Sequence, residues 1–510
     1  MTEPPRRPGS LQFVDAVVDP GTWRGWDRPL SPPPPHLDGE EYRADLARAR
    51  ARTGLDESVV TGEGDVRGRR VAVVAGEFGF LGGSIGVAAG ERLVRAIERA
   101  TRERLPLLAA PASGGTRMQE GTIAFLQMVK VAAAITDHRA AGLPYLVHLR
   151  HPTTGGVLAS WGSLGHVTTA EPGALIGFLG PRVHEALYGE PFPPGVQVAE
   201  NLLAHGIVDA VVPLARLAGA AARALAVLCG EAAPAVADGP GDATAGDVPA
   251  AESIRRSRRP ERPGLRALLT VAGQDVTLLS GTGAGERDPG LLLALARIGG
   301  TPCVVLGHDR HETDDGRSPA LGPAGLRMAR RGMRIAAELD LPLLSVVDTA
   351  GAALSREAEE GGLAGEIARS LADLVTLPSP TLCLLLGQGA GGGALALLPA
   401  DRVLAARHAW LSPLPPEGAS AILYRTTGRA DEVAARQGVR SADLLARGIV
   451  DRVVEEAPDA GRAEDAADAP EAFLTRLGTI LGAELAGLRT LPRAPRLAAR
   501  RARYRELGLH

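Results

Sequence analysis

Two glycine-rich turns contain the residues of this sequence that are best suited to chemistry. The first is HPTTGGV at 151–157, and the second is GQGAGGGA at 387–394. Each follows a short apolar run that is typical of a buried strand. Consecutive small residues at the start of a helix leave its first backbone N–H groups unshielded, and such groups can hold a negatively charged oxygen. The alternative is that these glycines only permit close packing of a strand against a helix.

The two turns occupy equivalent places in an internal duplication, and this recurrence favours a functional role for them. Three segments of the first half return in the same order in the second half, at offsets of 242, 237 and 236 residues: LLAHGIVDAVV (202–212) as LLARGIVDRVV (444–454), GGVLA (155–159) as GGALA (392–396), and, more weakly, ASGGTRMQEG (112–121) as DTAGAALSRE (348–357). A unit of this length is too long for a solenoid repeat, so the sequence predicts two homologous domains.

Within each half, short apolar strands alternate with amphipathic helices, which predicts α/β domains with largely parallel strands. The expected strands are 70–75, 105–110, 143–149, 301–306, 341–347 and 380–386, and the expected helices include 90–102 and 121–141. Ligands of such folds collect at the carboxyl ends of the strands. The expected segments are an N-terminal extension at 1–66, a first domain at 67–230, an exposed linker at 231–262, a second domain at 263–470 and a helical tail at 471–510 with a solvated arginine-rich face.

Composition narrows the function further. The chain has 510 residues, 45% of them hydrophobic and 23% charged, which is typical of a globular protein. Its formal net charge of −3 gives no electrostatic reason to expect a nucleic-acid partner. We expect no membrane span and no signal peptide, and therefore a cytoplasmic location. The only lysine is Lys130, so a phosphate-binding loop that ends in Gly-Lys is excluded. The three cysteines are expected to be small core residues.

Two further motifs suggest other functions. Gly387, Gly389 and Gly392 fit the G-x-G-x-x-G pattern, but no ribose-binding acid follows at the spacing that dinucleotide binding requires. The segment 82–86 fits the G-x-S-x-G pattern of a serine hydrolase, yet its preceding strand ends too early for a nucleophile elbow. We therefore expect Ser84 to act as the N-cap of a helix that begins at Ile85.

The histidines and the remaining acidic residues are weaker candidates. His148 and His151 flank a strand end, whereas His308 and His311 are expected in a solvated polar loop. Neither pair has the helix-borne spacing of metal ligands. Glu120 and Glu417 fall in polar turns, where they could support a neighbouring site.

Together, the ordered motifs identify a family. SGGTRMQEG, PTTGGV, AEPGALIGFLGP (170–181) and GIVD resemble the β subunit of bacterial acetyl-CoA carboxylase carboxyltransferase. DTAG (348–351), GQGAGGGALA (387–396) and PPEGASAIL (415–423) resemble its α subunit. The resemblance covers about 65–230 and 295–460, and the β-then-α order is similar to that of single-chain carboxyltransferases such as propionyl-CoA carboxylase β subunits.

This resemblance implies an α/β fold of two tandem crotonase-like domains, each a ββα superhelix. It implies a transferase that moves a carboxyl group from carboxybiotin, borne on a separate carrier protein, to acetyl-CoA or propionyl-CoA, giving malonyl-CoA or methylmalonyl-CoA for fatty acid or polyketide synthesis. The implied partners are the biotin carboxyl carrier protein, biotin carboxylase and a second copy of the chain, since the two halves of the site typically come from different protomers of at least a homodimer.

The candidate site residues fall into three groups, of which the resemblance implies the two holes, while Gly82, Gly83 and Ser84 are expected near CoA because a helix N-terminus attracts anions. Backbone oxyanion holes are expected at Gly155 with Gly156 and at Gly393 with Ala394; CoA binding is expected at Gly82, Gly83, Ser84, Gly114 and Gly115; the biotin side is expected at Gly351, Gly392, Glu417 and Gly418. The reaction forms two oxyanions, one on the thioester and one on biotin, and a duplicated turn supplies two holes without any metal.

The sequence also departs from the family pattern. The four-cysteine zinc ribbon that usually opens the β subunit is missing, so no zinc is expected. Ala350 replaces the usual proline of the α motif, and the loop at 352–362 differs from its usual form. Two alternatives stay open at this point: a malonyl- or glutaconyl-thioester decarboxylase of the same fold, and a non-catalytic scaffold of a carboxylase complex.

Overall fold

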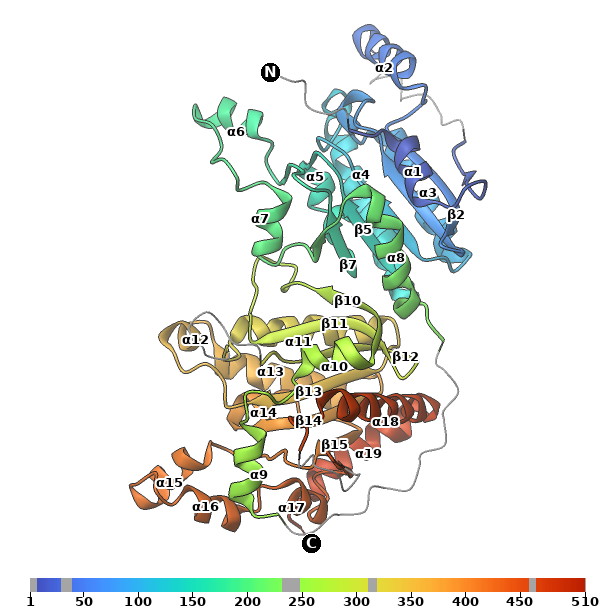
Figure 1. Cartoon of the computed structure of the whole chain (residues 1–510). Helices are drawn as coiled ribbons and strands as arrows, with labels where there is room; N and C mark the ends of the chain where they lie inside the picture. The colour runs from blue at the N-terminus through green and yellow to red at the C-terminus, as the bar shows by residue number, and fades with distance from the viewer. Residues whose placement is uncertain (1–6, 29–38, 232–247, 311–318, 458–464, 510) are drawn as a thin grey trace. The chain divides into compact units, whose positions relative to one another are not determined.

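The computed structural model describes residues 7–28, 39–231, 248–310, 319–457 and 465–509. The chain divides into two compact units: unit 1 comprises Met1–Cys229 with Gly283–Glu286, and unit 2 comprises Gly230–Thr282 with Arg287–His510. Each unit contains one seven-stranded sheet with helices packed on it (Figure 1).

The sheet of unit 1 begins with an antiparallel edge and continues with parallel strands. Its order is β1 (Arg24–Gly25), β2 (Val59–Val66), β3 (Arg69–Gly76), β4 (Leu107–Ala110), β5 (Tyr145–Leu149), β7 (Val167–Ala170) and β9 (Ala210–Val211). Pairing is antiparallel from β1 to β3 and parallel from β3 onward. The short strands β6 (Thr153–Thr154) and β8 (Ile176–Gly177) form a separate parallel pair.

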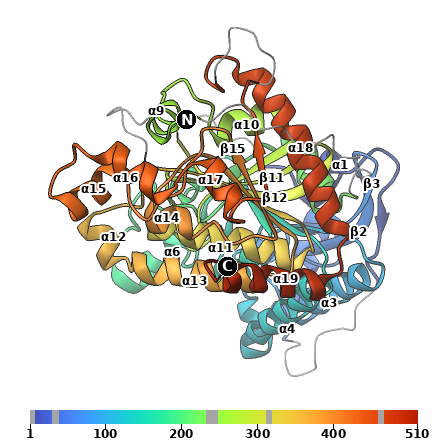
Figure 2. The ribbon, with the colours of Figure 1, turned by 90° about the horizontal axis from the view of Figure 1, so that it is seen from below.

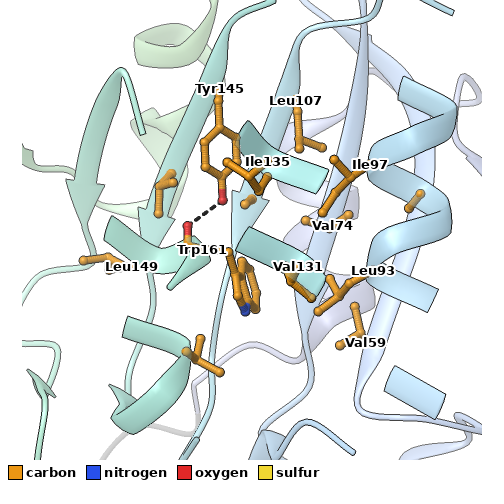
Figure 3. Packing of buried hydrophobic residues seen from close by; sticks show 14 of the residues in the cluster. Val59, Val74, Leu93, Ile97, Leu107, Val131, Ile135, Tyr145, Leu149 and Trp161 are labelled. Atoms are coloured by element: carbon orange, nitrogen blue, oxygen red, sulfur yellow. Dashed lines mark hydrogen bonds between the residues drawn. The ribbon is translucent and has the colours of Figure 1, made fainter. Parts of the chain in front are cut away.

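The core of unit 1 lies between its sheet and two long helices, α3 (Val87–Arg102) and α4 (Gly121–Ala140), which pack on each other. The alternate residues Ala72 and Val74 of β3 belong to this core. Val74 is drawn there in Figure 3. In the same core the Tyr145 hydroxyl donates a hydrogen bond to the Trp161 carbonyl at 2.6 Å. The other helices of unit 1 are α1 (Ser10–Val17), α2 (Glu40–Thr53), α5 (Gly155–Leu158), α6 (Pro181–Tyr188), α7 (Ala199–Ala204) and α8 (Leu214–Leu228).

Unit 2 repeats this plan. Its sheet order is β10 (Gly273–Leu279), β11 (Leu291–Ile298), β12 (Thr301–His308), β13 (Leu343–Thr349), β14 (Thr381–Gly389), β15 (Arg402–Ala406) and β16 (Arg452–Val454). Pairing is antiparallel from β10 to β12 and parallel from β12 onward. The strands that follow the antiparallel edge are buried on both faces, which explains their uninterrupted apolar sequences.

Helices pack on the sheet of unit 2 in two groups. One group contains α10 (Leu265–Ala272) and α18 (Pro470–Thr490), which contact each other and β11 (Figure 2). The other contains α11 (Pro323–Glu338) and α13 (Leu363–Thr376). The remaining helices are α9 (Ala250–Ser257), α12 (Arg356–Glu360), α14 (Gly391–Leu395), α15 (Pro416–Tyr424), α16 (Ala430–Gln437), α17 (Ser441–Ala446) and α19 (Arg493–Glu506).

All six expected strands and both expected helices are present. The boundaries expected for the N-terminal extension and for the linker, however, differ from those of the structure. Within the segment 1–66, β2 is the second strand of the sheet and α1 packs on β3, so the end of this segment belongs to the core of unit 1. Within the segment 231–262, α9 places Ala250 and Ile254 in an apolar cluster with Trp410. That part of the expected linker is therefore buried structure, and residues 232–247 lie outside the described part. Among the described helices, none is long and apolar enough to cross a membrane.

The C-terminal tail also differs from the expected solvated helix. In α19 the guanidinium groups of Arg496 and Arg500 are buried, and both donate to the carboxylate of Asp401 at 2.8 Å. The same carboxylate accepts the N–H of Thr381 at 2.8 Å. The sequence concealed this contact, because arginine is usually exposed and its buried acidic partner is about a hundred residues away.

We expect Asp401→Ala to destabilise unit 2 strongly. Removing one partner of a buried ion pair leaves the remaining charges without compensation and costs about 3–5 kcal/mol of unfolding free energy. Urea denaturation should show this as an earlier transition. Arg501→Ala, at an exposed position of the same helix, should change the unfolding free energy by no more than about 0.5 kcal/mol. Equal effects of the two substitutions would contradict the structural role assigned to Asp401.

Candidate active site

The first candidate site lies at the N-terminus of the short helix α5. Gly155 has φ +64°, and its N–H donates to the Phe178 carbonyl at 2.9 Å. This bond uses the N–H that the sequence analysis assigned to an oxyanion hole, so Gly155 orients the turn instead. In the described part of the chain, the N–H of the next residue, Gly156, donates to no protein acceptor.

A second loop, from Ser113 to Thr116, runs beside this helix N-terminus. The Gly115 N–H donates to the Ser113 hydroxyl oxygen at 3.0 Å, and Gly115 takes φ +112°. A Cβ on Gly115 would lie 3.5 Å from the nitrogen of Gly156, so the two backbones are nearly in contact. The N–H of Thr116, like that of Gly156, has no acceptor among the described residues. The Thr116 and Gly156 N–H groups are hereafter the first donor set.

The sequence analysis did not predict a free N–H at Thr116, because only the glycines before it were considered. The SGGT segment that ends at Thr116 was nevertheless one of the motifs that carried the family resemblance. In the observed geometry, one of the two free N–H groups comes from a helix start and the other from the neighbouring loop.

The four glycines and the one serine that are expected at the CoA side all lie in loops beside the first donor set. The Gly114 N–H donates to the Gly82 carbonyl at 2.8 Å, and a Cβ on Gly83 would approach the Ala112 carbonyl oxygen to 2.0 Å. Only glycine permits this approach. The loops that carry Gly82, Gly83, Ser84, Gly114 and Gly115 are thus brought together by their backbones.

Ser84 does not cap a helix at Ile85 as expected. Leu81–Gly83 forms a turn of 3-10 helix, and the Ser84 hydroxyl donates to the Leu81 carbonyl at 2.8 Å. Helix α3 begins at Val87, whose N–H donates to the carboxylate of Glu120 at 2.6 Å. The side chain that stabilises this helix start is therefore remote in sequence, which no local capping pattern could predict.

Unit 2 reproduces the same geometry, and its two glycines lie 236 residues after their counterparts in unit 1. Gly391 has φ +65°, and its N–H donates to the Ser412 carbonyl at 2.9 Å, as Gly155 does to Phe178. The Gly351 N–H donates to the Thr349 hydroxyl oxygen at 3.0 Å, as Gly115 does to Ser113. Gly392 is therefore the structural counterpart of Gly156.

The predicted second hole, Gly393 with Ala394, stays a prediction, but the helix geometry shows which of these N–H groups lack a partner within α14. The N–H groups of the first three residues of a helix have no partner within the helix. The N–H of the fourth residue bonds to the carbonyl of the residue that precedes the helix. Gly392 and Gly393 are the second and third residues of α14, and Ala394 is the fourth. The backbone of Gly393 faces Ala352, whose N–H would lie 3.2 Å from a Cβ at Gly393. The N–H groups of Gly392, Gly393 and Ala352 are hereafter the second donor set.

A cavity of about 1050 Å³ lies next to the second donor set. It is lined by Gly351, Ala352, Gly391 and Gly392 together with polar side chains: Arg258, His308, Asp309, Arg310, Asp348 and Gln388. Asp348 is the central polar group of this wall. Its carboxylate accepts the Gln388 N–H at 2.9 Å and faces Arg310 at 3.3 Å. The cavity therefore combines free backbone donors with fixed charges.

Glu417 and Gly418, both expected at the biotin side, lie in α15 outside the lining of this cavity. Glu417 nevertheless pairs with the cavity residue Arg258 at 2.6 Å. The hydrogen bond from Arg258 holds the pKa of Glu417 below its usual value. Glu417 is thus a support for a lining residue, while Gly418 has no contact that assigns it a role.

Two of the candidate histidines, His148 and His308, are buried and uncharged at neutral pH. Burial lowers the pKa of His148 to about 3 and that of His308 to about 4. His308 is not in a solvated loop as expected, because it ends β12 and its Nδ1 accepts the Asp348 N–H at 3.3 Å. His311 lies outside the described residues. Burial likewise raises the pKa of Cys303 and Cys383 to about 12, as expected for core thiols. Among the described residues, no cluster of three potential metal ligands occurs.

The chain is similar to known proteins over almost its whole length. A family model described as carboxyl transferase domain matches residues 39–493. A probable biotin-dependent acyl-coenzyme A carboxylase beta3 subunit of Mycobacterium tuberculosis is 61% identical over 499 residues, which are 98% of each chain. The acetyl-coenzyme A carboxylase carboxyl transferase subunits beta/alpha of Salinispora arenicola is 39% identical over 509 residues, covering 96% of this chain and 89% of that one.

Solved structures with low sequence identity share the fold. Transcarboxylase 12S, with hydrolysed methylmalonyl-coenzyme A bound, superposes with a TM-score of 0.73 at 20% identity and covers 96% of this chain and 90% of its own. A single-chain, multi-domain long-chain acyl-CoA carboxylase superposes with a TM-score of 0.68 at 20% identity, covering 92% of this chain and 46% of its own. The expected α/β fold of two tandem crotonase-like domains is thereby confirmed.

We expect the stability of unit 2 to fall when the pH is lowered from about 6.5 to about 4. In the unfolded chain His308 takes up a proton near its ordinary pKa of about 6.5, whereas the folded site excludes that proton until about pH 4. The stabilisation by neutral His308 is complete above pH 6.5 and is lost at about 1.4 kcal/mol per pH unit below it. In urea titrations between pH 5 and 6.5, His308→Gln should have a shallower pH dependence than the unaltered protein. An identical slope would contradict the buried, neutral state of this histidine.

Proposed function

Since the chain belongs to the carboxyl transferase domain family, we propose that it is the carboxyltransferase component of a biotin-dependent acyl-CoA carboxylase. The observation that carries this proposal is the duplicated pair of donor sets, each aimed from a helix start and a neighbouring loop. The 61% identity to a biotin-dependent acyl-coenzyme A carboxylase subunit supports the same reaction. The proposed acyl substrates are acetyl-CoA or propionyl-CoA, and the proposed partners are a biotin carrier protein and a biotin carboxylase.

The first donor set is proposed to stabilise the thioester side. When the α-carbon of an acyl-CoA loses its proton, negative charge develops on the thioester oxygen. The N–H groups of Gly156 and Thr116 would hold that oxygen, and donors fixed in advance pay no reorganisation cost when the charge forms. One such donor is typically worth about 3–4 kcal/mol of transition-state stabilisation.

The second donor set is proposed to hold the ureido oxygen of biotin. Carboxybiotin, a substrate brought by its carrier, supplies the carboxyl group and the base for the α-proton. The N–H groups of Gly392, Gly393 and Ala352 would stabilise the charge on the ureido oxygen, and the adjoining cavity of about 1050 Å³ offers space for the ring system. No side chain of the protein is assigned the proton transfer, which agrees with the burial and neutral state of His148 and His308.

Substitution of Gly156 tests this function. A Cβ at Gly156 would lie 3.1 Å from Met128 Cγ and 3.4 Å from the Thr116 hydroxyl, so the side chain of Gly156→Val would crowd the first donor set. We expect turnover to fall by about two to three orders of magnitude, the effect of losing one oxyanion donor. The assay is malonyl-CoA-dependent carboxylation of free biotin, repeated with methylmalonyl-CoA to compare acyl groups.

Gly487→Val is the matched control, because a Cβ at Gly487 meets no atom within 4 Å. This variant should retain nearly normal turnover. Gly393→Val should be as defective as Gly156→Val, since its Cβ would crowd the Ala352 N–H. A folded Gly156→Val protein with normal turnover would rule out the proposed use of the first donor set. Decarboxylation of malonyl-CoA without any biotin would instead indicate a decarboxylase.

We further propose that the active unit is at least a homodimer in which unit 1 of one protomer faces unit 2 of its partner. Apolar side chains are exposed on one helix of each unit: Phe125, Leu126 and Val129 on α4 in unit 1, and Ile422 and Leu423 on α15 in unit 2. Groups of exposed apolar side chains on one helix are typical of an interface.

Phe125→Glu should therefore weaken the dimer and lower turnover together. A charge placed in an apolar interface loses hydration without gaining a partner, which disfavours association. Light scattering should report at least twice the chain mass of 52.7 kDa for the unaltered protein and a smaller mass for the variant. Thr136→Glu, at an exposed position of the same helix, should change neither property. A fully active monomer would refute the proposed arrangement.

A further inference from the structure

Arg117, the residue that follows Thr116, is completely buried and central to a polar network in unit 1. Its side chain is 0% exposed, and its guanidinium donates to both carboxylate oxygens of Glu57 at 2.6 and 2.7 Å. Burial acts to lower the pKa of Arg117, but the hydrogen bonds and charge of Glu57 outweigh it, and the pKa is raised. Arg117 is therefore a permanently charged group held in one geometry.

The same guanidinium connects the two glycine-rich loops beside the first donor set. Arg117 Nη2 donates to the Ser84 carbonyl at 2.8 Å. The backbone N–H of Arg117 donates to the Ile85 carbonyl at 3.0 Å, and the Ile85 N–H donates to the Gly115 carbonyl at 2.9 Å. Arg117 therefore holds the loop at 82–86 twice, through its side chain at Ser84 and through its backbone at Ile85.

Two further contacts extend this network to helices. The Tyr42 hydroxyl, on α2, accepts from Arg117 Nη1 at 3.3 Å and donates to Glu120. Glu120 lies 3.5 Å from Arg117 Nη1 and also accepts the first N–H of α3. One buried cation therefore ties α2, the start of α3 and both loops together. Glu57 and Tyr42 come from the segment that the sequence analysis treated as an extension.

Unit 2 forms the equivalent backbone pairing without such a cation. Ala353 stands 236 residues after Arg117, and its N–H donates to the Leu321 carbonyl at 2.9 Å. The fold itself thus does not require an arginine at this position. Unit 1 has more glycine in these loops: Gly86 and Gly115 have counterparts in Gly322 and Gly351, whereas Gly82, Gly83 and Gly114 have none. Such loops have many accessible backbone conformations, and fixing one of them needs an additional constraint.

We propose that Arg117 is a positioning residue for the acyl-CoA side of the reaction. Its buried ion pair with Glu57 fixes the loop at 113–116, so that the Thr116 N–H stays aligned with the Gly156 N–H. The inference rests on the proposed function of these two donors. Misplacement of a catalytic donor by about 1 Å can cost about a hundredfold in rate, so a small movement of this loop has a measurable consequence.

The test is a comparison of Arg117→Lys with Arg92→Lys. Lysine keeps the positive charge in both variants but cannot donate to two carboxylate oxygens and a carbonyl in a planar fork. Arg92 is the matched control: it is 4% exposed and donates to both oxygens of Asp56 at 2.9 and 2.7 Å, the residue next to Glu57. In the described residues it bonds to neither glycine-rich loop.

Both variants are assayed as full-length protein by malonyl-CoA-dependent carboxylation of free biotin, together with urea denaturation. Arg117→Lys should lower kcat by about ten- to a hundredfold, with the KM for free biotin within about twofold, because the loop that it aligns holds the charge of the transition state. Arg92→Lys should keep kcat within about twofold at a similar loss of urea midpoint.

Two results would overturn the inference: normal kcat in Arg117→Lys, or losses of kcat in both variants that simply follow their urea midpoints. Gly156→Val separates this inference from the proposed function. If Gly156→Val is inactive while Arg117→Lys is normal, only the positioning role fails. If folded Gly156→Val is fully active, the assignment of the first donor set fails, and the inference fails with it.

Discussion

Close backbone-to-backbone approach at glycine is the constraint on which both donor sets depend. Gly155 and Gly391 adopt φ values near +65°, a conformation that residues with a side chain rarely adopt, and each gives its N–H to the carbonyl of a neighbouring segment. This single bond sets the direction in which the short helix begins. The next N–H group of the helix then has no acceptor among the described residues. The neighbouring loop lies so close that an added Cβ would reach 3.5 Å from a backbone nitrogen in unit 1 and 3.2 Å in unit 2.

The cost of this arrangement is conformational freedom, and the two units restrict that freedom by different means. Unit 1 fixes its loops around a buried cation, Arg117, which binds Glu57 and the backbone of the neighbouring loop. Unit 2 uses a buried anion, Asp348, which accepts the Gln388 N–H and faces Arg310. A buried charge that is fully paired is a rigid support, because any movement would leave it without compensation. The duplicated fold therefore preserves the backbone geometry while its polar supports have diverged.

This divergence would serve the proposed division of the reaction between the two sites. In the proposed reaction both sites would stabilise an oxygen that gains negative charge, so both would require the same kind of backbone donor. Their surroundings differ. The donors of unit 2 lie next to a large cavity lined by charged side chains, whereas those of unit 1 lie next to closely packed, glycine-rich loops. Binding of two chemically different substrates by one duplicated fold needs this combination of a shared core and separate walls.

The sequence by itself was sufficient to predict the duplication, the alternation of strands and helices, the family and the two glycine-rich turns. Each of these features depends on motifs or patterns of residues that are close together in the chain. Tertiary structure decided which N–H groups are free. The Gly155 N–H bonds to the Phe178 carbonyl, whereas the Thr116 and Gly156 N–H groups have no acceptor among the described residues. In α14, Gly392 and Gly393 are the second and third residues, and Ala394 is the fourth. Tertiary structure also decided that β2, His308 and the arginines of α19 are buried. The physical reason is the same in each case: a hydrogen bond or an ion pair between distant segments is satisfied only after folding, and no local pattern specifies its partner.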